Sequence, residues 1–583
     1  MGDRLASAHP VPWKGVLTEI ARRSRRVPVV QLLSGYDRSW ARPDLTAGLV
    51  LAAMLVPQGM AYAELTGLPA YTGIYTTIAA LLAYSVFGPN RRLVLGPDSS
   101  LAPVIAAVVL PLAAGDPTTA IVLASAMSIL AGLVCLAAGY LSLGVVTELL
   151  SKPLRIGYLN GIAVLIFVSQ VPKALGFSVS AESTLETVVE TVKGIAGNEV
   201  VAGALAISVA SVAVIVGLNK VTKAVPGVVI AALGSIGAVA LFGLSSVDTV
   251  GAIPSGLPPL TIPGFDVSLV PALLGGAVAV AVVSFADTGA LSTATALKSG
   301  EHIDPNSEIK ALGAANLLSG LFQGFATSAS SSRTAVAMAV GAKSQLAGLI
   351  AGLGVILIVV FAPGVVSGIP APTLAAIVIT ASFTLFDWTG VAWLWKARRS
   401  EFILMLGAFL GVLVLGVLEG IGVAIVLSLA NFFRKAWRPH STELGRVPGV
   451  PGFHDRERHP EAEVVPGLLL VRYDAPIFFA NAADFGRRLQ ELLRSADRPI
   501  RTVVVVGNAI TDIDTTGAEI LDHVLDDLES RDIDFAFAGL KGPTKDRLRR
   551  YGVYGRLGDG NFFPNTLSAV ASHEHDVEDP VEG

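Results

Sequence analysis

Residues 330–334 read Ser-Ser-Ser-Arg-Thr and combine four hydroxyl groups with one cation. They lie inside a long apolar region, where a charged side chain is costly unless it is paired or faces water. Serine and threonine favour the start of a helix, where free N–H groups and the positive end of the helix dipole attract anions. The pattern predicts a pocket for an anionic solute at membrane depth, with Ser331 and Ser332 as contacts. Arg333 is assigned to the same site, where it either holds the anion directly or only sets the electrostatic field.

A second segment of this kind occurs in the first half of the chain. Residues 96–100 read Gly-Pro-Asp-Ser-Ser and open another short apolar stretch. Short, interrupted segments at matching positions in two halves are typical of inverted repeats. Extended-looking residues, 92–95 and 325–329, precede the two segments, and irregular backbone at this depth must be buried or line a cavity. We therefore expect two half-helices whose N-termini meet, with Ser99 and Ser100 as further contacts.

Two other side chains are candidates for the same pocket. Gln58 can both donate and accept hydrogen bonds, and Tyr62 lies one helical turn further along the same face. Both are assigned to substrate binding; the alternative for each is a contact between helices, worth about 1 kcal/mol for a glutamine hydrogen bond. A carboxylate repels a dianion, so Asp98 is expected to cap its own half-helix or to pair with Arg333 when the site is empty.

Asp287 is the candidate for energy coupling. Moving a dianion into a negatively charged cell costs about 2.3 kcal/mol per charge per 100 mV, or roughly 5 kcal/mol. Uptake must then be coupled to a cation or to an exchanged anion. Asp287 lies between apolar residues in the eighth predicted span, where it can bind a proton or a sodium ion. The alternative is a structural partner for a backbone N–H or a hydroxyl group. Glu64, Glu308 and Glu419 lie near span ends, where water is available, and are assigned structural roles.

The composition requires a membrane environment for these residues. Of 583 residues, 52% are hydrophobic and 15% charged, and the mean hydropathy is +0.64, which excludes an ordinary soluble protein. Between about residues 44 and 437, apolar runs near the roughly 20 residues of a transmembrane helix follow one another. We count about fourteen, two of them short. Cys135, the only cysteine, lies in an apolar run and serves as a small hydrophobe. The fold class is a polytopic α-helical membrane protein.

Cations indicate the orientation. Residues 1–43 are basic and lack the apolar core of a signal peptide, so they are predicted to be cytoplasmic. Lysine and arginine in most other loops then fall on the same side, and the connection 245–268 has neither, as expected outside. This distribution favours an even number of spans with both termini in the cytoplasm.

The C-terminal part has a different composition. After the transmembrane region 44–437, a polar linker is expected over 438–465. Strand-like and helix-like segments alternate in 466–572, which predicts a small soluble α/β domain. Residues 573–583 are acidic and predicted to be a disordered tail.

Several long motifs resemble the sulfate permease (SulP) family of anion transporters. They are VPQGMAYAELTGLPAYTGIY (56–75), GPDSSLAPV (96–104), IDPNSEIKALGAANLLSGLFQGF (303–325) and SSSRTAVAMAVGAKSQLAG (330–348). The resemblance covers about residues 44–570 and implies about seven plus seven inverted spans, divided into core and gate domains with half-helices as third and tenth spans. It also implies a cytoplasmic STAS domain and a homodimer. FGPNRR (87–92) departs from the family pattern Y-x-x-x-G-[T/S]-S-[K/R], which leaves the subfamily and substrate open.

The resemblance also implies roles for individual residues. Gln58 matches a substrate-contacting glutamine, Ser332 and its half-helix backbone match the anion site, and Asp287 matches a carboxylate that is often glutamate. DIDTTG (512–517) resembles the STAS loop that carries a phosphorylatable serine in anti-sigma-antagonist relatives, so Thr515 is a possible regulatory residue. The favoured alternative is helix capping by Asp514 or Thr515.

The expected function is secondary active transport of an inorganic anion, sulfate first, across the plasma membrane by proton or sodium symport or by anion exchange. Bicarbonate or dicarboxylate transport and an uncoupled anion channel are alternatives. A neutral-solute symporter of the same architecture would not need the arginine, and a signalling protein with a membrane anchor would not need buried polar half-helices. The sequence shows no P-loop, metal-ligand cluster or nucleophilic triad, so we expect no enzyme, cofactor, metal or nucleic-acid partner. A cytoplasmic protein is a possible partner of the STAS domain.

Overall fold

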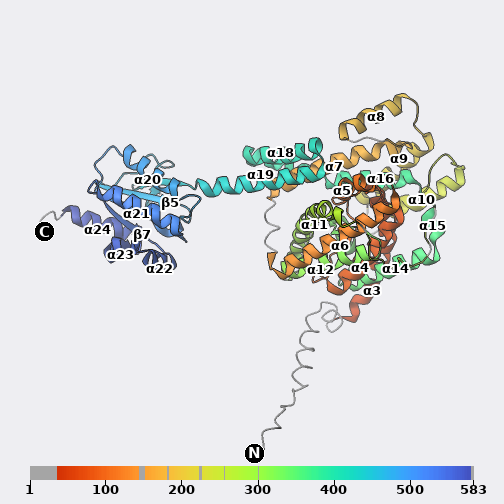
Figure 1. The fold of residues 1–583 in the computed structure, drawn as a ribbon, viewed down its shortest axis with the longest axis horizontal. Helices are drawn as coiled ribbons and strands as arrows, with labels where there is room; N and C mark the ends of the chain where they lie inside the picture. Colours follow the sequence, from red (N-terminus) through yellow and green to blue (C-terminus); the bar gives the residue numbers. More distant parts are fainter. Residues whose placement is uncertain are drawn as a thin grey trace, which may run out of the picture. The chain divides into compact units, whose positions relative to one another are not determined.

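The chain forms two compact units, Met1–Ser428 and Leu429–Gly583 (Figure 1). The computed structural model describes residues 36–143, 151–179, 183–221, 226–251, 253–254, 256–264, 266–299, 301 and 303–578. Most of the predicted N-terminal segment therefore lies outside the described residues. The two units differ in composition and are described separately.

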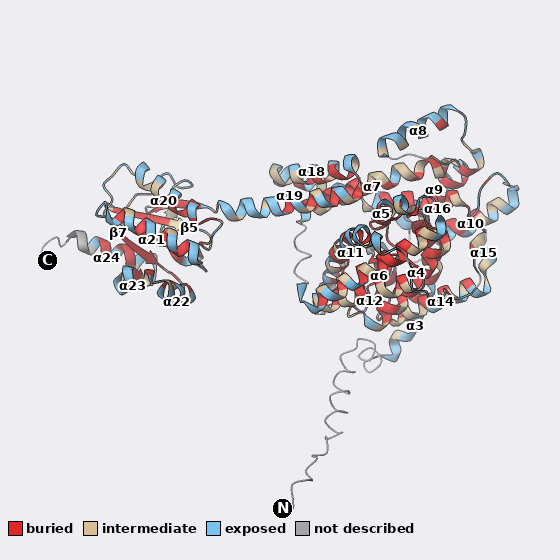
Figure 2. Ribbon diagram, viewed as in Figure 1, coloured by how far each residue is buried: buried red, intermediate tan, exposed pale blue. Residues whose placement is uncertain are grey.

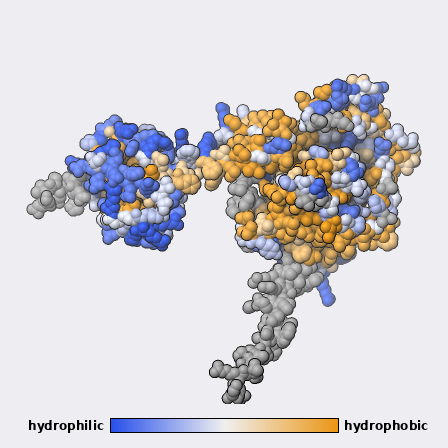
Figure 3. Space-filling view, in the orientation of Figure 1, coloured by the Kyte–Doolittle hydropathy of each residue, from blue (hydrophilic) through white to orange (hydrophobic). Residues whose placement is uncertain are grey.

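The first unit consists of apolar helices. In the described part of the chain, eight helices are long and apolar enough to cross a membrane. They are Arg38–Leu65, Ala70–Phe87, Pro117–Tyr140, Lys152–Leu175, Ala202–Val221, Val270–Ala296, Ala371–Ala397 and Val417–Trp437. Shorter apolar helices are Ala102–Ala113, Gly227–Phe242 and Leu346–Phe361. Hydrophobic side chains cover much of the visible surface of this unit (Figure 3), as a lipid environment requires. The count of about fourteen spans and the inverted repeat stay predictions.

The elements follow one another in this order: η1 (Arg38–Trp40), α3 (Ala41–Leu65), α4 (Ala70–Phe87), β1 (Leu95–Gly96), α5 (Ala102–Ala113), α6 (Pro117–Tyr140), α7 (Lys152–Leu175), α8 (Thr184–Ala196), α9 (Ala202–Val221), α10 (Gly227–Phe242), η3 (Val267–Leu269), α11 (Val270–Ser299), α12 (Pro305–Leu321), β2 (Ser328–Ala329), α13 (Ser331–Val340), α14 (Leu346–Phe361), α15 (Pro363–Ser367), α16 (Ala371–Leu385), α17 (Trp388–Ala397), α18 (Arg399–Leu415) and α19 (Val417–Trp437). The boundary between the two units falls within α19.

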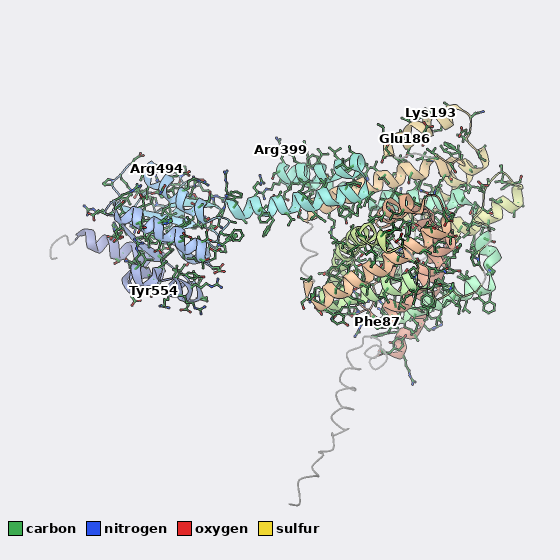
Figure 4. The ribbon with its side chains drawn as sticks, viewed as in Figure 1. Phe87, Glu186, Lys193, Arg399, Arg494 and Tyr554 are labelled. Atoms are coloured by element: carbon green, nitrogen blue, oxygen red, sulfur yellow. The ribbon has the colours of Figure 1, made fainter. Side chains whose placement is uncertain are left out.

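Small residues let the inner helices approach closely. A Cβ atom on Gly73 of α4 would lie 1.9 Å from the carbonyl oxygen of Gly59 on α3. A Cβ atom on Gly320 of α12 would lie 2.4 Å from the Ser125 oxygen on α6. Backbones in contact are typical of helix packing in membranes, where dispersion replaces the hydrophobic effect. Figure 2 shows α4 mostly buried and α8 mostly exposed. Figure 4 labels Glu186 and Lys193 on that exposed helix.

A short antiparallel ladder joins the two halves of the first unit. Leu95 of β1 pairs with Ala329 of β2, and Gly96 pairs with Ser328. The two strands fall at the extended stretches predicted before the half-helices, and α5 and α13 follow them. Both of these helices are short, with 12 and 10 residues.

Buried polar side chains satisfy the irregular backbone around β2. Phe325 N donates to Thr76 Oγ1 at 2.9 Å, Thr327 N to Asn316 Oδ1 at 2.8 Å, and Ala329 N to Thr288 Oγ1 at 3.2 Å. These acceptors come from α4, α12 and α11. Because a buried backbone N–H without a partner is costly, they hold the ladder in place within an apolar interior.

The second unit contains a six-stranded sheet with the order β4-β3-β5-β6-β7-β8. The strands are β3 (Ser441–Gly445), β4 (His454–Asp455), β5 (Leu468–Tyr473), β6 (Thr502–Val506), β7 (Asp534–Ala538) and β8 (Phe562–Phe563). The last four are parallel, with Leu468 opposite Thr502 and Thr502 opposite Asp534. The helices are η4 (Gly507–Ala509), α20 (Ala482–Ser495), α21 (Thr515–Glu529), α22 (Gly542–Tyr551), α23 (Val553–Leu557), η5 (Asp559–Asn561) and α24 (Thr566–Glu578). Both sheet faces are buried, as the continuous apolar runs of β5 and β6 require.

Two sequence-based boundaries differ from the structure. The predicted linker 438–465 contains β3 and β4, which belong to the sheet. Helix α24 reaches Glu578, so residues 573–578 are helical where disorder was expected. The acidic composition did not indicate the contacts that hold this helix in place. Ala569 and Val570 are buried against the sheet, and His573 Nε2 lies 3.1 Å from Pro466 O. Residues 579–583 of the predicted tail lie outside the described residues.

Candidate functional site

A cavity of about 680 Å³ lies in the first unit at the starts of the two half-helices. Five of the predicted site residues line it: Tyr62, Ser99, Asp287, Ser331 and Ser332. The volume is in the range of small-molecule sites. The structure thus places five candidates, from four separate parts of the sequence, around one space.

Three other predicted residues lie just behind the cavity wall. Gln58 Nε2 donates to Tyr62 Oη at 3.0 Å, and Ser100 Oγ lies 3.2 Å from Asp287 Oδ2. Arg333 is fully buried. These residues contact the lining without belonging to it.

The N-terminus of α13 presents hydroxyl groups to the cavity. Ser330 is the N-cap residue with extended backbone angles (φ −123°, ψ 132°), and its Oγ lies 3.0 Å from Ser332 Oγ. Ser331 and Ser332 are exposed in the first turn. The first N–H groups of a helix have no acceptor within it, and the positive dipole end adds to their field. This arrangement can bind an oxyanion.

Arg333 is buried and does not belong to the cavity lining. Its guanidinium donates to the backbone oxygens of Pro97, Gly96 (3.3 Å) and Ser328 (3.0 Å), which belong to the ladder strands and the residue after β1. It also lies 3.6 Å from Asp98 Oδ1. A planar fork with several donors suits such a set of carbonyl groups. The described geometry therefore holds the arginine in the scaffold, without placing it in the cavity lining.

Asp98 makes one of the two contacts that its position suggested. Its Oδ2 accepts from Ser100 N at 3.2 Å and from Ser100 Oγ at 2.7 Å, in the turn before α5. Its other oxygen forms the ion pair with Arg333. The predicted pairing with the arginine is therefore present, but the predicted cap is not: the N-cap residue of α5 is Leu101, and no side chain caps this helix.

Two cations of the lining were missed as site residues. Lys152 and Arg155 lie in the first turn of α7 and line the cavity, whereas their sequence positions indicate only the cytoplasmic side of the membrane. A signal was present, because cations in the first turn of a helix oppose its dipole and therefore need another partner. An anion in the cavity would be such a partner. Asp387, the N-cap residue of α17, also lines the cavity.

Glu308 differs from its predicted setting. It was expected near water at a span end, but it is 1% exposed and accepts hydrogen bonds of 2.6 Å from both Tyr84 Oη and Ser292 Oγ. These partners come from α4 and α11, which cover the start of α12 and exclude water. The sequence alone could not show that coverage.

Thr515 belongs to the second unit and is the exposed first residue of α21. Asp514 is the cap: its Oδ1 accepts from Gly517 N at 2.7 Å and its Oδ2 from Phe479 N at 2.8 Å. The structure thus shows the helix cap at Asp514, and modification of Thr515 stays a prediction.

Comparison with known proteins agrees with this architecture. Residues 42–408 match the sulfate permease family, and residues 459–569 match the STAS domain. A probable sulfate transporter of Mycobacterium tuberculosis is 37% identical over 545 residues, which cover 93% of this chain and 97% of that protein. The chloroplastic sulfate transporter 4.1 of Arabidopsis thaliana is 31% identical over 553 residues, covering 90% of this chain and 79% of that one.

Solved structures show the same fold. The murine solute carrier 26 family member A9 anion transporter, in an inward-facing state, superposes with a TM-score of 0.86 at 20% identity, covering 98% of this chain and 96% of that one. The transmembrane domain of a cyanobacterium bicarbonate transporter gives 0.59 at 22% identity, covering 67% and 98%. The predicted multi-pass membrane fold with a C-terminal STAS domain is confirmed, and the protein is a transporter and not an enzyme. This chain belongs to the sulfate permease family of anion transporters.

Proposed function

We propose that this protein carries sulfate through the cavity at the start of α13. Ser331, Ser332 and the free N–H groups of the first turn form the anion contacts, and Tyr62 and Ser99 complete the lining. The observation that carries the proposal is the pair of exposed serines at a helix N-terminus that opens into a cavity with five predicted residues. The names of the Mycobacterium and Arabidopsis relatives favour sulfate as the substrate.

Arg333, Gln58 and Ser100 act from behind the lining. The positive charge of Arg333 favours an anion in the cavity, while its hydrogen bonds hold the two half-helix starts together. Gln58 orients Tyr62 through the 3.0 Å hydrogen bond, and Ser100 orients Asp287. Lys152 and Arg155 increase the anion concentration at the cavity, because a concave site lined with one sign of charge focuses its field.

The transport is secondary active. Asp287 is the coupling residue for a proton or sodium ion, with anion exchange as the other mode, since a dianion cannot accumulate against a negative interior without a driving ion. Bicarbonate is a second candidate substrate because a fold relative is a bicarbonate transporter. A dicarboxylate substrate and an uncoupled anion channel remain alternatives of the same site.

We place the protein in the plasma membrane as a homodimer with both termini in the cytoplasm. The connection 245–268, without lysine or arginine, is external in this arrangement. A cytoplasmic protein that contacts the STAS domain near Thr515 is a further proposed partner.

The test is uptake of radiolabelled sulfate into proteoliposomes that contain the full chain. A pH gradient and a sodium gradient are imposed in turn, and bicarbonate and a dicarboxylate compete with sulfate. Accumulation of sulfate above its external concentration supports the proposal. Accumulation of bicarbonate without sulfate would assign the second substrate, and an anion current without gradient-driven accumulation would indicate a channel.

A further inference from the structure

Two carboxyl groups of the cavity wall meet at one hydroxyl group. Ser100 Oγ lies 2.7 Å from Asp98 Oδ2 and 3.2 Å from Asp287 Oδ2. Asp98 comes from the turn before α5, Asp287 comes from α11, and both line the cavity. A serine hydroxyl carries one hydrogen, so it can donate fully to only one carboxylate. The second contact is also a hydrogen bond if the other carboxyl group is protonated and donates to Ser100 Oγ.

The surroundings indicate which group carries that hydrogen. Asp98 accepts from Ser100 N at 3.2 Å and lies 3.6 Å from the buried guanidinium of Arg333, and these are the partners of an ionised carboxylate. Among the described residues, Ser100 is the hydrogen-bond partner of the Asp287 side chain. The donor order is then Asp287 O–H to Ser100 Oγ, and Ser100 O–H to Asp98.

A second observation points to a ligand at this place. Tyr158 on α7 is fully buried and precedes Leu159, a residue of the cavity lining. Its hydroxyl has no hydrogen-bond partner among the described residues. A buried hydroxyl of this kind ordinarily has a partner, so the interior next to the α7 part of the lining has hydrogen-bonding capacity left for a proton carrier such as water.

The charged and titratable groups around the pair come from every neighbouring element. They are Tyr62 of α3, Lys152, Arg155 and Tyr158 of α7, Arg333 of α13 and Asp387 before α17. The lining is thus cationic on the α7 side and hydroxyl-rich on the α13 side. An anion at Ser331 and Ser332 adds negative charge to the cavity that Asp98 lines, and Asp98 is the carboxylate paired with Arg333.

We infer that Asp98 and Asp287, bridged by Ser100, together hold the coupling proton: the pair carries one proton when the cavity holds no anion and takes up a second when the anion binds. This inference rests on the proposed anion transport through the same cavity. A dianion beside an ionised aspartate favours protonation of that aspartate, because like charges at short distance raise its proton affinity. Neutral Asp98 then leaves the charge of Arg333 to the anion.

The proton transfer balances. Asp287 gives its hydrogen to Ser100 Oγ while Ser100 gives its own to Asp98 Oδ2. Asp287 then takes one proton from the bulk solution, delivered as hydronium through the cavity, so that both carboxyl groups are neutral and one proton has entered. The reverse sequence returns this proton to water after the anion leaves. The driving ion is then the proton, and sodium is excluded from this step.

The experiment is calorimetric titration of the full chain in detergent with sulfate, at constant sodium, in two buffers with different ionisation heats. One proton taken up per sulfate makes the Kd rise about tenfold per pH unit wherever the second proton is not already bound. Asp98→Asn keeps the shape but cannot take up the proton, so we expect its Kd to be independent of pH and its proton uptake to approach zero. Asp116→Asn is the matched control, because Asp116 caps α6 on the exposed surface and asparagine caps equally well.

A second pair of variants tests the bridge. Ser100→Ala leaves both carboxyl groups without the shared hydroxyl and should lower the proton uptake, while Ser100→Thr should restore it. This pair decides the question if Asp98→Asn does not fold. The inference is overturned if the unmodified protein binds sulfate equally at every pH, if binding follows sodium, or if Asp98→Asn retains the full proton uptake. Absence of sulfate binding at every pH would instead overturn the proposed function.

Discussion

Arg333 on α13 donates a hydrogen bond to the backbone oxygen of Gly96 on β1, 3.3 Å away. The arginine thereby connects the two segments that start the half-helices, and its further partners are the oxygens of Pro97 and Ser328. A residue predicted from sequence as an anion contact is thus also part of the scaffold.

Replacement of Arg333 should affect folding and transport together. Arg333→Ala leaves Asp98 buried without its cation, and breaking such a pair costs about 3–5 kcal/mol. We expect a large loss of thermal stability in detergent and loss of sulfate uptake. The double variant Arg333→Met/Asp98→Asn, which removes both charges, should recover part of the stability. Normal stability of Arg333→Ala would show that the arginine does not hold the scaffold.

Removal of the Ser332 hydroxyl should weaken sulfate affinity and leave the fold intact. A hydrogen bond to a charged group contributes about 1.5–3 kcal/mol, which corresponds to roughly a 10- to 150-fold increase in the KM for Ser332→Ala. Initial uptake rates at graded sulfate concentrations measure it. Ser367→Ala, at the end of α15 and outside the cavity lining, is the control. An unchanged KM in Ser332→Ala would exclude a direct role of this side chain.

The contact between α3 and α4 should not tolerate a methyl group. In Gly73→Ala the new Cβ would lie 1.9 Å from Gly59 O, so the helices must separate. Overpacking typically costs 1–3 kcal/mol or more, and we expect a lower melting temperature together with weaker transport, since Gln58 and Tyr62 lie on α3. Gly217→Ala on α9, where a Cβ meets no atom within 4 Å, is the matched control. Equal melting temperatures of the two variants would contradict the packing.

The STAS domain should lose stability in acid through Asp455. Burial raises the pKa of this carboxyl, but hydrogen bonds from His440, Thr442 and the N–H of Glu457 outweigh burial and hold its pKa below the usual value. A carboxyl with a lowered folded-state pKa stabilises the fold above its unfolded-state pKa of about 3.9, and this contribution is lost as the pH falls through the folded value. The protection factors of the β3 amides against hydrogen exchange, which remove the pH dependence of the chemical exchange rate, should fall in the full chain as the pH is lowered from about 5 to about 2. Asp455→Asn should flatten this dependence, and an unchanged profile in the variant would rule out Asp455 as its source.

The sequence predicted which residues lie around the cavity better than it predicted their contacts. Serines 331 and 332 stand at a helix start because their types, their position after irregular backbone and the surrounding apolar runs all indicate it. The extended residues before each half-helix were also visible, and the ladder at Leu95 and Ala329 lies within them. These features are local, so a single chain segment reveals them.

Long-range partners were not visible in the same way. The oxygens that hold Arg333 are backbone atoms, which every residue has, so no residue type marks them. Lysines and arginines near span ends indicate the orientation of any membrane protein, so Lys152 and Arg155 do not stand out in the sequence. Only the packing of α7 shows that they line the cavity. Glu308 was expected near water because its sequence position is close to a span end, but α4 and α11 cover it.

The ladder of β1 and β2 has a consequence for biosynthesis. When the ribosome has made only the first half of the chain, the N–H and C=O groups of Leu95 and Gly96 have no strand to pair with, because β2 is synthesised much later. Unpaired backbone groups are costly inside a lipid bilayer. The first half-helix should therefore stay in a hydrated or chaperoned environment at the translocon until α13 arrives, and a chain truncated after α12 should be recognised by quality-control proteases.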